Sequence, residues 1–390
     1  MVKVMAAILL AMACTSSLSA APAQHGRTIP LLIGTYTGGS SRGIYVYRFD
    51  RQTGRIAPRP VQVVPAPNPS WLTLSAGGRR LYAVNENGPG QRDPVGRVSA
   101  WRIDRASGHL APINRVLSLG AEPTHSSLSR DGRMLFVANY SGATDPGGTL
   151  AVVPVAGNGA LQPVTQIKTH RASMADPARQ LAPHVHSVVS SPDGRFVFAQ
   201  DLGADRIYVY AYDPAQREAP LAALRDQPWV VLPPGSGPRH LVFSPDGHHA
   251  YVTLEMAGAV AVFDHADGHL TLRQTLGLAP DGFAGRVGAG ALHLSPDGRY
   301  LIVADRGTDN SLVTFAVDPA TGALQPAGRR SVEGEQPREF TIDRSGRFVI
   351  VANQHSHAVI VFRRDPATGQ IGDRVQSLAL DDAADVKLVE

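Results

Sequence analysis

Residues 237–255 of this 390-residue chain read Gly237-Pro238-Arg239-His240-Leu241-Val242-Phe243-Ser244-Pro245-Asp246-Gly247-His248-His249-Ala250-Tyr251-Val252-Thr253-Leu254-Glu255. Two apolar segments flank a Ser-Pro-Asp-Gly turn, which is typical of two antiparallel strands joined by a tight hairpin. The same order starts at Pro183-His184-Val185-His186 and turns at Ser191-Pro192-Asp193-Gly194. The two copies differ mainly in the polar residues before the first strand and after the second.

The turn glycine recurs at intervals of roughly 50 residues, at Gly78, Gly132, Gly194, Gly247, Gly298 and Gly346. A β-rich strand such as Leu301-Ile302-Val303-Ala304-Asp305 follows each turn, then a third strand, then in several copies an Asp-x-x-x-Gly turn such as Asp318 to Gly322. Units of four short strands at this period are typical of a β-propeller. Residues 168–182 interrupt the repeat, and we expect a loop or helical insertion there.

The two ends of the chain predict how the ring closes. A partial unit from Leu31 to Phe49 precedes the six complete ones and lacks an innermost strand, while Asp385-Val386-Lys387-Leu388-Val389 forms a strand without a unit of its own. We therefore predict an all-β, seven-bladed β-propeller, one domain over residues 24–390, whose ring is closed by pairing of the N- and C-terminal strands.

Residues 1–23 have the pattern of a signal peptide, with Lys3, an apolar run over 4–13 and small residues at Ser19-Ala20-Ala21. We expect a secreted or periplasmic protein without a membrane span, because the apolar run is too short to cross a bilayer. The only cysteine, Cys14, lies in this segment, so the mature chain would lack thiol chemistry; lipidation of Cys14 is the alternative. The net charge of +4 is dispersed, which argues against nucleic-acid binding.

The repeat also predicts where function resides. Because the hairpin joins strands one and two, residues before strand one and after strand two lie at the same end of every blade, and these ends meet around the propeller axis. We call this end the mouth. The polar and aromatic residues expected there are Trp71, Asn85, Glu86, His125, Asn139, Tyr140, His184, His186, Gln200, Asp201, Arg239, His240, Glu255, Arg306, Arg338, Glu339, Asn353 and Gln354.

Two histidines of the mouth suggest proton transfer. His184 and His186 alternate along a strand and should point to the same side. An imidazole titrates near neutral pH, which favours His184 as a general acid or base, whereas His186 is as well explained by packing in the wall. Both histidines with Glu255 could bind zinc, but the spacing matches no compact metal motif, so we predict neither metal nor cofactor.

The arginines of the mouth predict an anionic ligand. Arg239, Arg306 and Arg338 would converge there, and guanidinium groups bind carboxylate or phosphate in bidentate fashion. Glu86 and Glu255 lie among them, either as bases or as partners that orient an arginine.

The sequence resembles the seven-bladed propeller lactonases, which include a bacterial 6-phosphogluconolactonase and fungal carboxymuconate-lactonising enzymes. The resemblance extends from Ile33-Gly34-Thr35-Tyr36-Thr37 to the last strand, and its specific motifs are Pro183-His184-Val185-His186, Gly237-Pro238-Arg239-His240, Glu255, Asp305-Arg306-Gly307 and Gln336-Pro337-Arg338-Glu339-Phe340. It implies acid/base chemistry at His184, Arg239 and Glu255, with Arg306 or Arg338 holding the substrate anion. Leu254 departs from the asparagine that family members commonly have before the carboxylate.

The resulting expectation is an exported lactonase that hydrolyses a sugar-acid or related lactone and binds a small anionic lactone or organic acid. Alternatives are a carboxymuconate-type lactonising cycloisomerase and a non-catalytic binding propeller. The predicted catalytic residues are His184, Glu255 and Arg239. The predicted substrate-binding residues are His186, His240, Arg306, Arg338, Glu86, His125 and Asn353.

Overall fold

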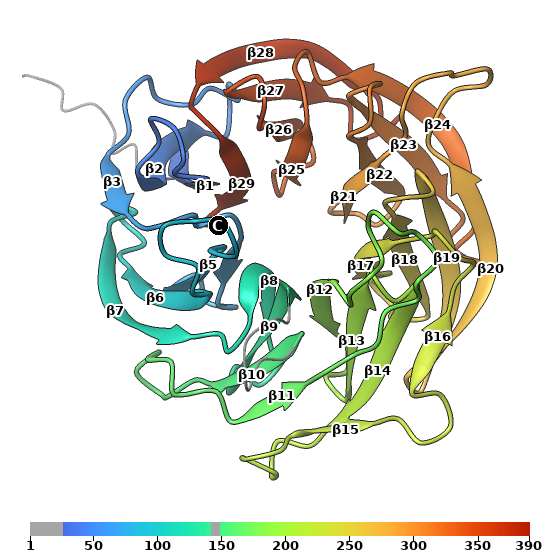
Figure 1. Cartoon of the computed structure of the whole chain (residues 1–390). Helices are drawn as coiled ribbons and strands as arrows, with labels where there is room; N and C mark the ends of the chain where they lie inside the picture. Colours follow the sequence, from blue (N-terminus) through green and yellow to red (C-terminus); the bar gives the residue numbers. More distant parts are fainter. Residues whose placement is uncertain (1–25, 142–148) are drawn as a thin grey trace, which may run out of the picture.

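The computed structural model describes residues 26–141 and 149–390, and the signal peptide predicted at residues 1–23 lies outside these ranges. In the described part of the chain every regular element is a β-strand, and the strands form seven antiparallel sheets arranged in a ring (Figure 1). The prediction of an all-β, seven-bladed β-propeller is therefore confirmed. Within the described ranges, the chain has no helix with the length and apolar character needed to cross a membrane.

Each blade is one sheet, with its innermost strand beside the propeller axis. From the axis outward, the first blade consists of β29 (Ala383–Leu388), β1 (Thr28–Thr35), β2 (Gly43–Asp50) and β3 (Gln62–Pro65), and the second of β4 (Leu72–Leu74), β5 (Arg80–Asn85), β6 (Arg97–Ile103) and β7 (Leu110–Leu117). The third blade consists of β8 (Ala121–Leu128), β9 (Met134–Ser141), β10 (Leu150–Pro154) and β11 (Gln166–Lys168). The fourth consists of β12 (Val185–Ser190), β13 (Phe196–Asp201), β14 (Arg206–Tyr212), β15 (Leu221–Ala223) and β16 (Trp229–Val231).

The remaining three blades are regular. The fifth blade consists of β17 (Pro238–Phe243), β18 (His249–Leu254), β19 (Ala259–Ala266) and β20 (His269–Gly277). The sixth consists of β21 (Ala289–Leu294), β22 (Tyr300–Asp305), β23 (Ser311–Val317) and β24 (Leu324–Ser331), and the seventh of β25 (Pro337–Ile342), β26 (Phe348–Asn353), β27 (Ala358–Arg364) and β28 (Ile371–Ala379). The fourth blade is the exception, because two short strands, β15 and β16, both pair with β14 in place of one outer strand.

The Ser-Pro-Asp-Gly segments are the hairpin turns between the first and second strands of a blade. In the turn between β17 and β18, the Asp246 carboxylate accepts a hydrogen bond from the His248 backbone (3.0 Å), and Ser244 Oγ accepts one from the His249 backbone (2.9 Å). Gly247 has a φ of +77°, a conformation that costs glycine little and other residues more. The turn chemistry therefore fixes the hairpin, and with it the position of the strand ends at the mouth.

The ring closes as the sequence predicts. The C-terminal strand β29 is the innermost strand of the first blade and pairs antiparallel with β1, from Leu31–Leu388 to Thr35–Ala383. The C-terminus accordingly lies near the axis in Figure 1. The first blade thus combines both ends of the chain.

Deletion of Asp385–Glu390 is expected to open this ring. The deletion removes most of β29 and the buried side chains of Val386 and Val389, so we expect Tm to fall by at least roughly 5 °C, given that each kcal/mol corresponds to a few degrees. Deletion of the exposed Glu390 alone is the control. Calorimetry of both truncations tests the closure, and an unchanged Tm after the longer deletion would contradict it.

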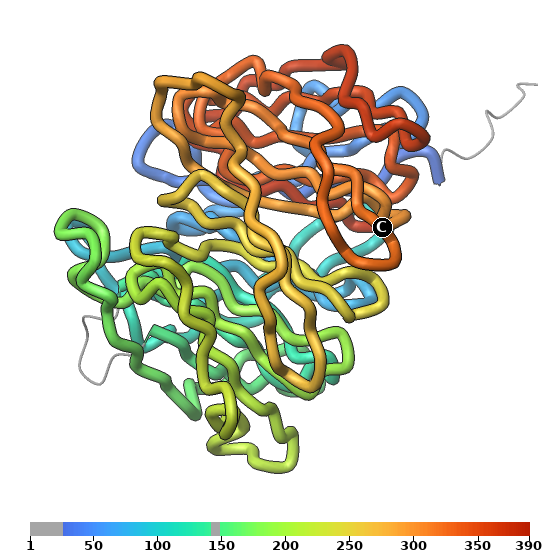
Figure 2. Tube along the Cα trace, turned by 90° about the vertical axis from the view of Figure 1, so that its right-hand side faces the viewer, coloured from blue at the N-terminus to red at the C-terminus, as the bar shows by residue number. Residues whose placement is uncertain are grey.

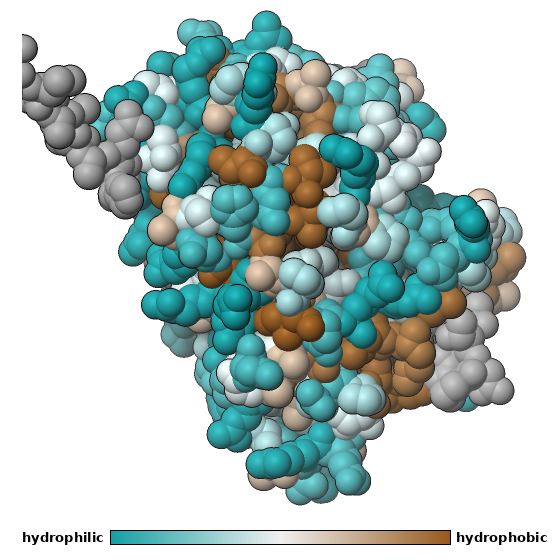
Figure 3. All heavy atoms as spheres, turned by 90° about the vertical axis from the view of Figure 1, so that its left-hand side faces the viewer, coloured by the Kyte–Doolittle hydropathy of each residue, from teal (hydrophilic) through white to brown (hydrophobic). Residues whose placement is uncertain are grey.

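The apolar core lies between neighbouring blades. Ile33 of the first blade packs with Ile350 and Val361 of the seventh in one cluster, and Val152 of the third packs with Val188 and Val197 of the fourth in another. A view onto the rim shows the chain running back and forth between the two faces of the ring (Figure 2). The opposite side of the rim is mostly hydrophilic, with separate hydrophobic patches (Figure 3).

The insertion predicted at residues 168–182 is an irregular loop without a helix. It spans residues 169–184, between β11 and β12. The loop is hydrogen-bonded to the turn that follows β13. The Ser173 backbone donates to the Gly203 carbonyl (2.8 Å), and the Gln180 side chain donates to the Leu202 carbonyl (2.8 Å). The loop is therefore packed on its own blade.

Candidate active site

Several innermost strands are irregular at the mouth, and these irregularities position the predicted site residues. The register shifts between Val185 and Ser187 in β12, between Pro238 and Leu241 in β17, and between Pro337 and Glu339 in β25. The residues within these shifts are His186, Arg239, His240 and Arg338. A β-bulge redirects a side chain out of the regular alternation, which explains how these residues face the mouth.

Glu255 is the centre of a cluster of arginines. Its Oε2 lies 3.0 Å from Arg239 Nε and 3.6 Å from Arg306 Nη1, and its Oε1 accepts a hydrogen bond from Arg179 Nη2 (2.8 Å). The contact with Arg239 is an ion pair without hydrogen-bond geometry. One carboxylate thus holds three guanidinium groups that come from two blades and the loop 169–184.

Burial and charge act in opposite directions in this cluster. Burial raises the pKa of Glu255, but Arg306, Arg239 and Arg179 outweigh it and lower the pKa to about 2. Burial lowers the pKa of Arg239 to about 9, and Arg306 and Arg338 act in the same direction. At neutral pH both groups therefore remain charged, and Glu255 is a weak base.

The low pKa of Glu255 predicts an acid-sensitive fold. A carboxyl whose pKa falls from 4.5 to about 2 on folding stabilises the folded state above pH 4.5, and this contribution is lost as the pH falls toward 2. The free energy of unfolding of the wild type should therefore decline more steeply between these pH values than that of the Glu255→Gln variant. Urea titrations across this range measure the difference, and equal slopes would contradict the assignment.

A second ion pair lies at the mouth between the first, second and seventh blades. Arg338 Nη2 lies 3.3 Å from Glu86 Oε2, and the Tyr36 hydroxyl donates to the same oxygen (2.8 Å). The Arg338 guanidinium also lies 5.0 Å from the centre of the Tyr36 ring. The two ion-pair clusters are close enough for the Glu255 carboxylate to raise the pKa of Arg338 against the effect of burial, and for Arg338 to add to the effect of burial in lowering the pKa of Arg306.

His184 lies at the edge of the mouth, where the loop 169–184 enters β12. Its Nδ1 is 2.7 Å from the Tyr140 carbonyl oxygen, and its ring stacks on the Tyr140 ring at 4.3 Å. A carbonyl only accepts hydrogen bonds, so Nδ1 bears the hydrogen and the neutral ring has its lone pair on Nε2. Arg179 Nη2 reaches the Tyr140 hydroxyl (3.3 Å), which places His184 next to the Glu255 cluster.

Three further predicted residues, His125, His186 and His240, form a buried lining. The ring centres of His240 and His186 are 5.2 Å apart, those of His240 and His125 are 5.7 Å apart, and Trp71 packs on His125 at 4.2 Å. Burial lowers the pKa of His125 to about 3 and holds the pKa values of His186 and His240 well below the usual range. These imidazoles are therefore neutral at pH 7.

The structure does not bring Asn353, a predicted substrate-binding residue, together with this group. The side chain is fully buried, and its Nδ2 donates to the Val332 carbonyl (2.9 Å) in the connection between β24 and β25. Asn85 binds the Pro67 carbonyl (2.8 Å) in the same way at the entrance to its own blade. At these two positions the carboxamide thus braces the incoming chain.

Three residues at the mouth were not among the predicted site residues. Arg179 comes from the loop, where no repeat signals its position. Tyr36 follows β1, which is the second strand of the first blade, so aligning the partial first unit with the others would have identified it. Tyr140 was placed at the mouth by the repeat, but no role was assigned to it.

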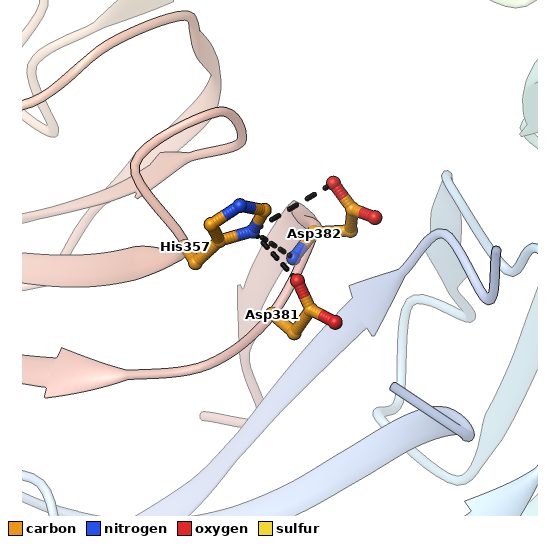
Figure 4. Close-up of side chains that lie close together, drawn as sticks. All are labelled: His357, Asp381 and Asp382. Carbon is orange, nitrogen blue, oxygen red and sulfur yellow. Dashed lines mark hydrogen bonds and ion pairs between the residues drawn. The ribbon is translucent and has the colours of Figure 1, made fainter. Parts of the chain in front are cut away.

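Within the described ranges, one group of side chains has the composition of a metal site, and it adjoins Tyr36, whose backbone N–H donates to the Asp382 carbonyl (3.0 Å). His357, Asp381 and Asp382 bring three ligand atoms within 4.8 Å of one another (Figure 4). His357 Nδ1 is 2.6 Å from Asp381 Oδ1, and Asp381 Oδ2 accepts hydrogen bonds from the backbone and hydroxyl of Ser40. These contacts connect the β1–β2 loop to the last blade, so ring closure accounts for them.

Comparison with known proteins identifies the family. The family model described as "Lactonase, 7-bladed beta-propeller" matches residues 30–388. A 6-phosphogluconolactonase from Formosa agariphila is 31% identical over 363 residues, which is 92% of this chain and 99% of the relative. A 6-phosphogluconolactonase from Bacillus subtilis is 31% identical over 341 residues, covering 87% of this chain and 92% of the relative.

Solved structures agree with this result. The periplasmic gluconolactonase PpgL of Pseudomonas aeruginosa superposes with a TM-score of 0.90 at 54% identity, over 93% of this chain and 99% of that one. A putative 6-phosphogluconolactonase of Bacteroides fragilis superposes with a TM-score of 0.85 at 34% identity, over 95% of this chain and 100% of that one. The chain therefore belongs to the lactonase family of seven-bladed β-propellers.

Proposed function

We propose that this protein hydrolyses a sugar-acid or related lactone at the mouth formed by His184, Glu255 and Arg239. The observation that supports this most directly is the combination of a histidine with a free lone pair and a carboxylate that holds three guanidinium groups. Related proteins of the family are named for the hydrolysis of gluconolactone and 6-phosphogluconolactone. Both are cyclic esters of hydroxy acids.

In the proposed reaction, water attacks the lactone carbonyl and its proton passes to His184 Nε2. A bond forms between the water oxygen and the carbonyl carbon, and negative charge develops on the carbonyl oxygen. Arg239 and Arg306 stabilise that charge. The ring ester bond then breaks, and His184 returns the proton to the departing alkoxide, which yields the open hydroxy acid.

His184 is preferred to Glu255 as the base on electrostatic grounds. A base works best when its pKa lies near the working pH, whereas the arginines hold the pKa of Glu255 at about 2. Glu255 instead keeps Arg239, Arg306 and Arg179 in place and lets three positive charges gather around one carboxylate. Its proposed role is therefore to orient the arginines.

The charge of the mouth favours an anionic substrate. Among the described residues, the ion pairs of the mouth join four arginines to two carboxylates, Glu255 and Glu86, so positive charge is in excess within these two clusters; the arginines are Arg179, Arg239, Arg306 and Arg338. A lactone with a carboxylate or phosphate should bind better than a neutral one. We further propose that the protein is exported, which is supported by the N-terminal pattern and by the similarity to a periplasmic gluconolactonase.

The proposal is tested with purified protein and a panel of glucono-δ-lactone, 6-phosphogluconolactone, other aldonolactones and cis,cis-muconates. Proton release measures ring opening of a lactone, and loss of diene absorbance measures ring closure of a muconate. Saturable ring opening, with a kcat/KM at least roughly 10-fold higher for charged than for neutral lactones, is the expected result. Ring closure of a muconate would identify a lactonising cycloisomerase, and tight binding without turnover would identify a binding propeller.

A further inference from the structure

A buried carboxylate outside the proposed chemistry connects the two ends of the loop 169–184. Asp201, the last residue of β13, is fully buried. Its Oδ1 accepts a hydrogen bond from the His184 backbone (2.8 Å) at the exit of the loop. Its Oδ2 lies 2.8 Å from His170 Nδ1 at the entrance. One side chain therefore fixes both points at which the loop joins the blade.

The His170 end of this connection is itself held by two tyrosines of β14. The Tyr210 hydroxyl is 2.7 Å from His170 Nε2, and the Tyr208 ring stacks on the imidazole at 3.5 Å. Both imidazole nitrogens are therefore hydrogen-bonded, Nε2 to Tyr210 and Nδ1 to Asp201, so each polar atom of this buried chain has a partner.

The turn after β13 completes the attachment. The Ala204 backbone donates to Asp201 Oδ1 (3.0 Å), and the Leu202 backbone donates to the His184 carbonyl (2.9 Å). A Cβ at Gly203 would lie 2.0 Å from the Ala182 carbonyl oxygen, so the loop approaches the turn as closely as a glycine allows. The loop exit is thus held against β13 by both hydrogen bonds and shape.

Two residues of the mouth depend on this attachment. His184 is the last residue of the loop, and Arg179 extends from its outer part to Glu255 Oε1 (2.8 Å) and to the Tyr140 hydroxyl (3.3 Å). The Arg179 side chain is 43% exposed, so little packing holds it in place. Its position, and the angle of the His184 ring, follow from where the two ends of the loop are fixed.

We propose that Asp201, together with His170 and Tyr210, is a positioning device for the reaction: it fixes the loop 169–184 so that His184 and Arg179 meet Tyr140 and Glu255 in the productive arrangement. This inference rests on the proposed function for its kinetic consequence. It assigns no contact with substrate to Asp201, which acts only through the residues of the loop. The cost of misplacing reacting groups by about 1 Å is about 10²-fold in rate.

The test compares Asp201→Ala with a matched control, Asp343→Ala. Asp343 is also a buried aspartate that accepts backbone hydrogen bonds, from Phe348 (2.7 Å) and Ser345 (3.1 Å). It lies in the turn between β25 and β26, at the end of the ring opposite the mouth. Both changes remove a buried carboxylate and should lower Tm. We expect Asp201→Ala alone to lower kcat, by about 10²-fold.

Hydrogen–deuterium exchange gives a second readout that needs no substrate. Backbone amides of residues 173–182 should exchange faster in Asp201→Ala than in the wild type and should be unchanged in Asp343→Ala. The His170→Ala variant, which frees only the entrance of the loop, should show the same faster exchange of these amides. It replaces Asp201→Ala in the test if Asp201→Ala does not fold. Tyr210→Phe should show a smaller increase in the exchange rate of these amides.

The outcomes separate this inference from the proposed function. If the kcat of Asp343→Ala falls as far as that of Asp201→Ala, or if exchange in the loop is unchanged, the positioning device is wrong. If the wild type turns over no lactone while loop exchange responds as expected, the proposed function fails and the structural role of Asp201 stands. The fold-loss of kcat in the double variant Asp201→Ala/Arg179→Ala should be smaller than the product of the losses in the two single variants, because Asp201 acts in part through Arg179.

Discussion

Glu255→Gln is expected to lower kcat by roughly 10²–10³-fold, which is the effect of disturbing groups that stabilise a developing oxyanion. Glutamine has the shape of glutamate but lacks its charge, and its amide nitrogen would face guanidinium donors. Arg239, which is 1% exposed, would then be a buried cation next to Arg306 without its ion-pair partner. We expect these arginines to move apart and to lose the arrangement that binds the carbonyl oxygen.

The same change should also lower stability, because removing one partner of a buried ion pair costs about 3–5 kcal/mol. Kinetics are therefore measured well below the Tm of the variant and compared with those of Asp343→Asn, which weakens a turn at the other end of the ring. A Glu255→Gln protein that is destabilised but fully active would show that the carboxylate only braces the blades. It would remove Glu255 from the active site.

The fold was predictable from the sequence because a propeller repeats its local signals. The turn Ser244–Gly247 specifies its own hairpin, and six copies of that hairpin fix the number of complete blades. Closure also followed, since β1 lacked an inner neighbour and the terminal strand lacked a blade. The split of the outer strand into β15 and β16 was not predicted, because strands on the rim are short and pair on one side only.

The location of the site was predictable, and its internal contacts were not. The repeat placed Arg239, Glu255 and Arg306 at one end, but pairing depends on the bulges that redirect Arg239 and Arg338, and a bulge has no clear signal in a single sequence. Arg179 depends on a loop that the repeat does not describe. The contact of Asn353 with the Val332 carbonyl was not predictable, because the pattern gives the end of a strand and not the direction of its side chain.

His184→Asn is expected to lower kcat by roughly 10²–10⁴-fold, the usual contribution of a general base. Asparagine is the appropriate replacement because its side-chain N–H can still donate to the Tyr140 carbonyl, as His184 Nδ1 does at 2.7 Å. The substitution removes the lone pair of Nε2 and keeps the hydrogen bond that holds the end of the loop. Tm should therefore change by no more than about 2 °C, consistent with a partly exposed position that keeps its contact.

The matched comparison is His186→Asn, two residues further along the chain and within β12. His186 is 5% exposed, and burial holds its pKa well below the usual range, so it lines the site as a neutral ring. We expect its replacement to lower kcat/KM by less than roughly 10-fold. Only His184→Asn removes the Nε2 lone pair that accepts the proton of the attacking water, so the large loss of kcat should be confined to that variant. If His184→Asn keeps the wild-type rate, the base is another group, and Glu255 becomes the leading candidate despite its low pKa.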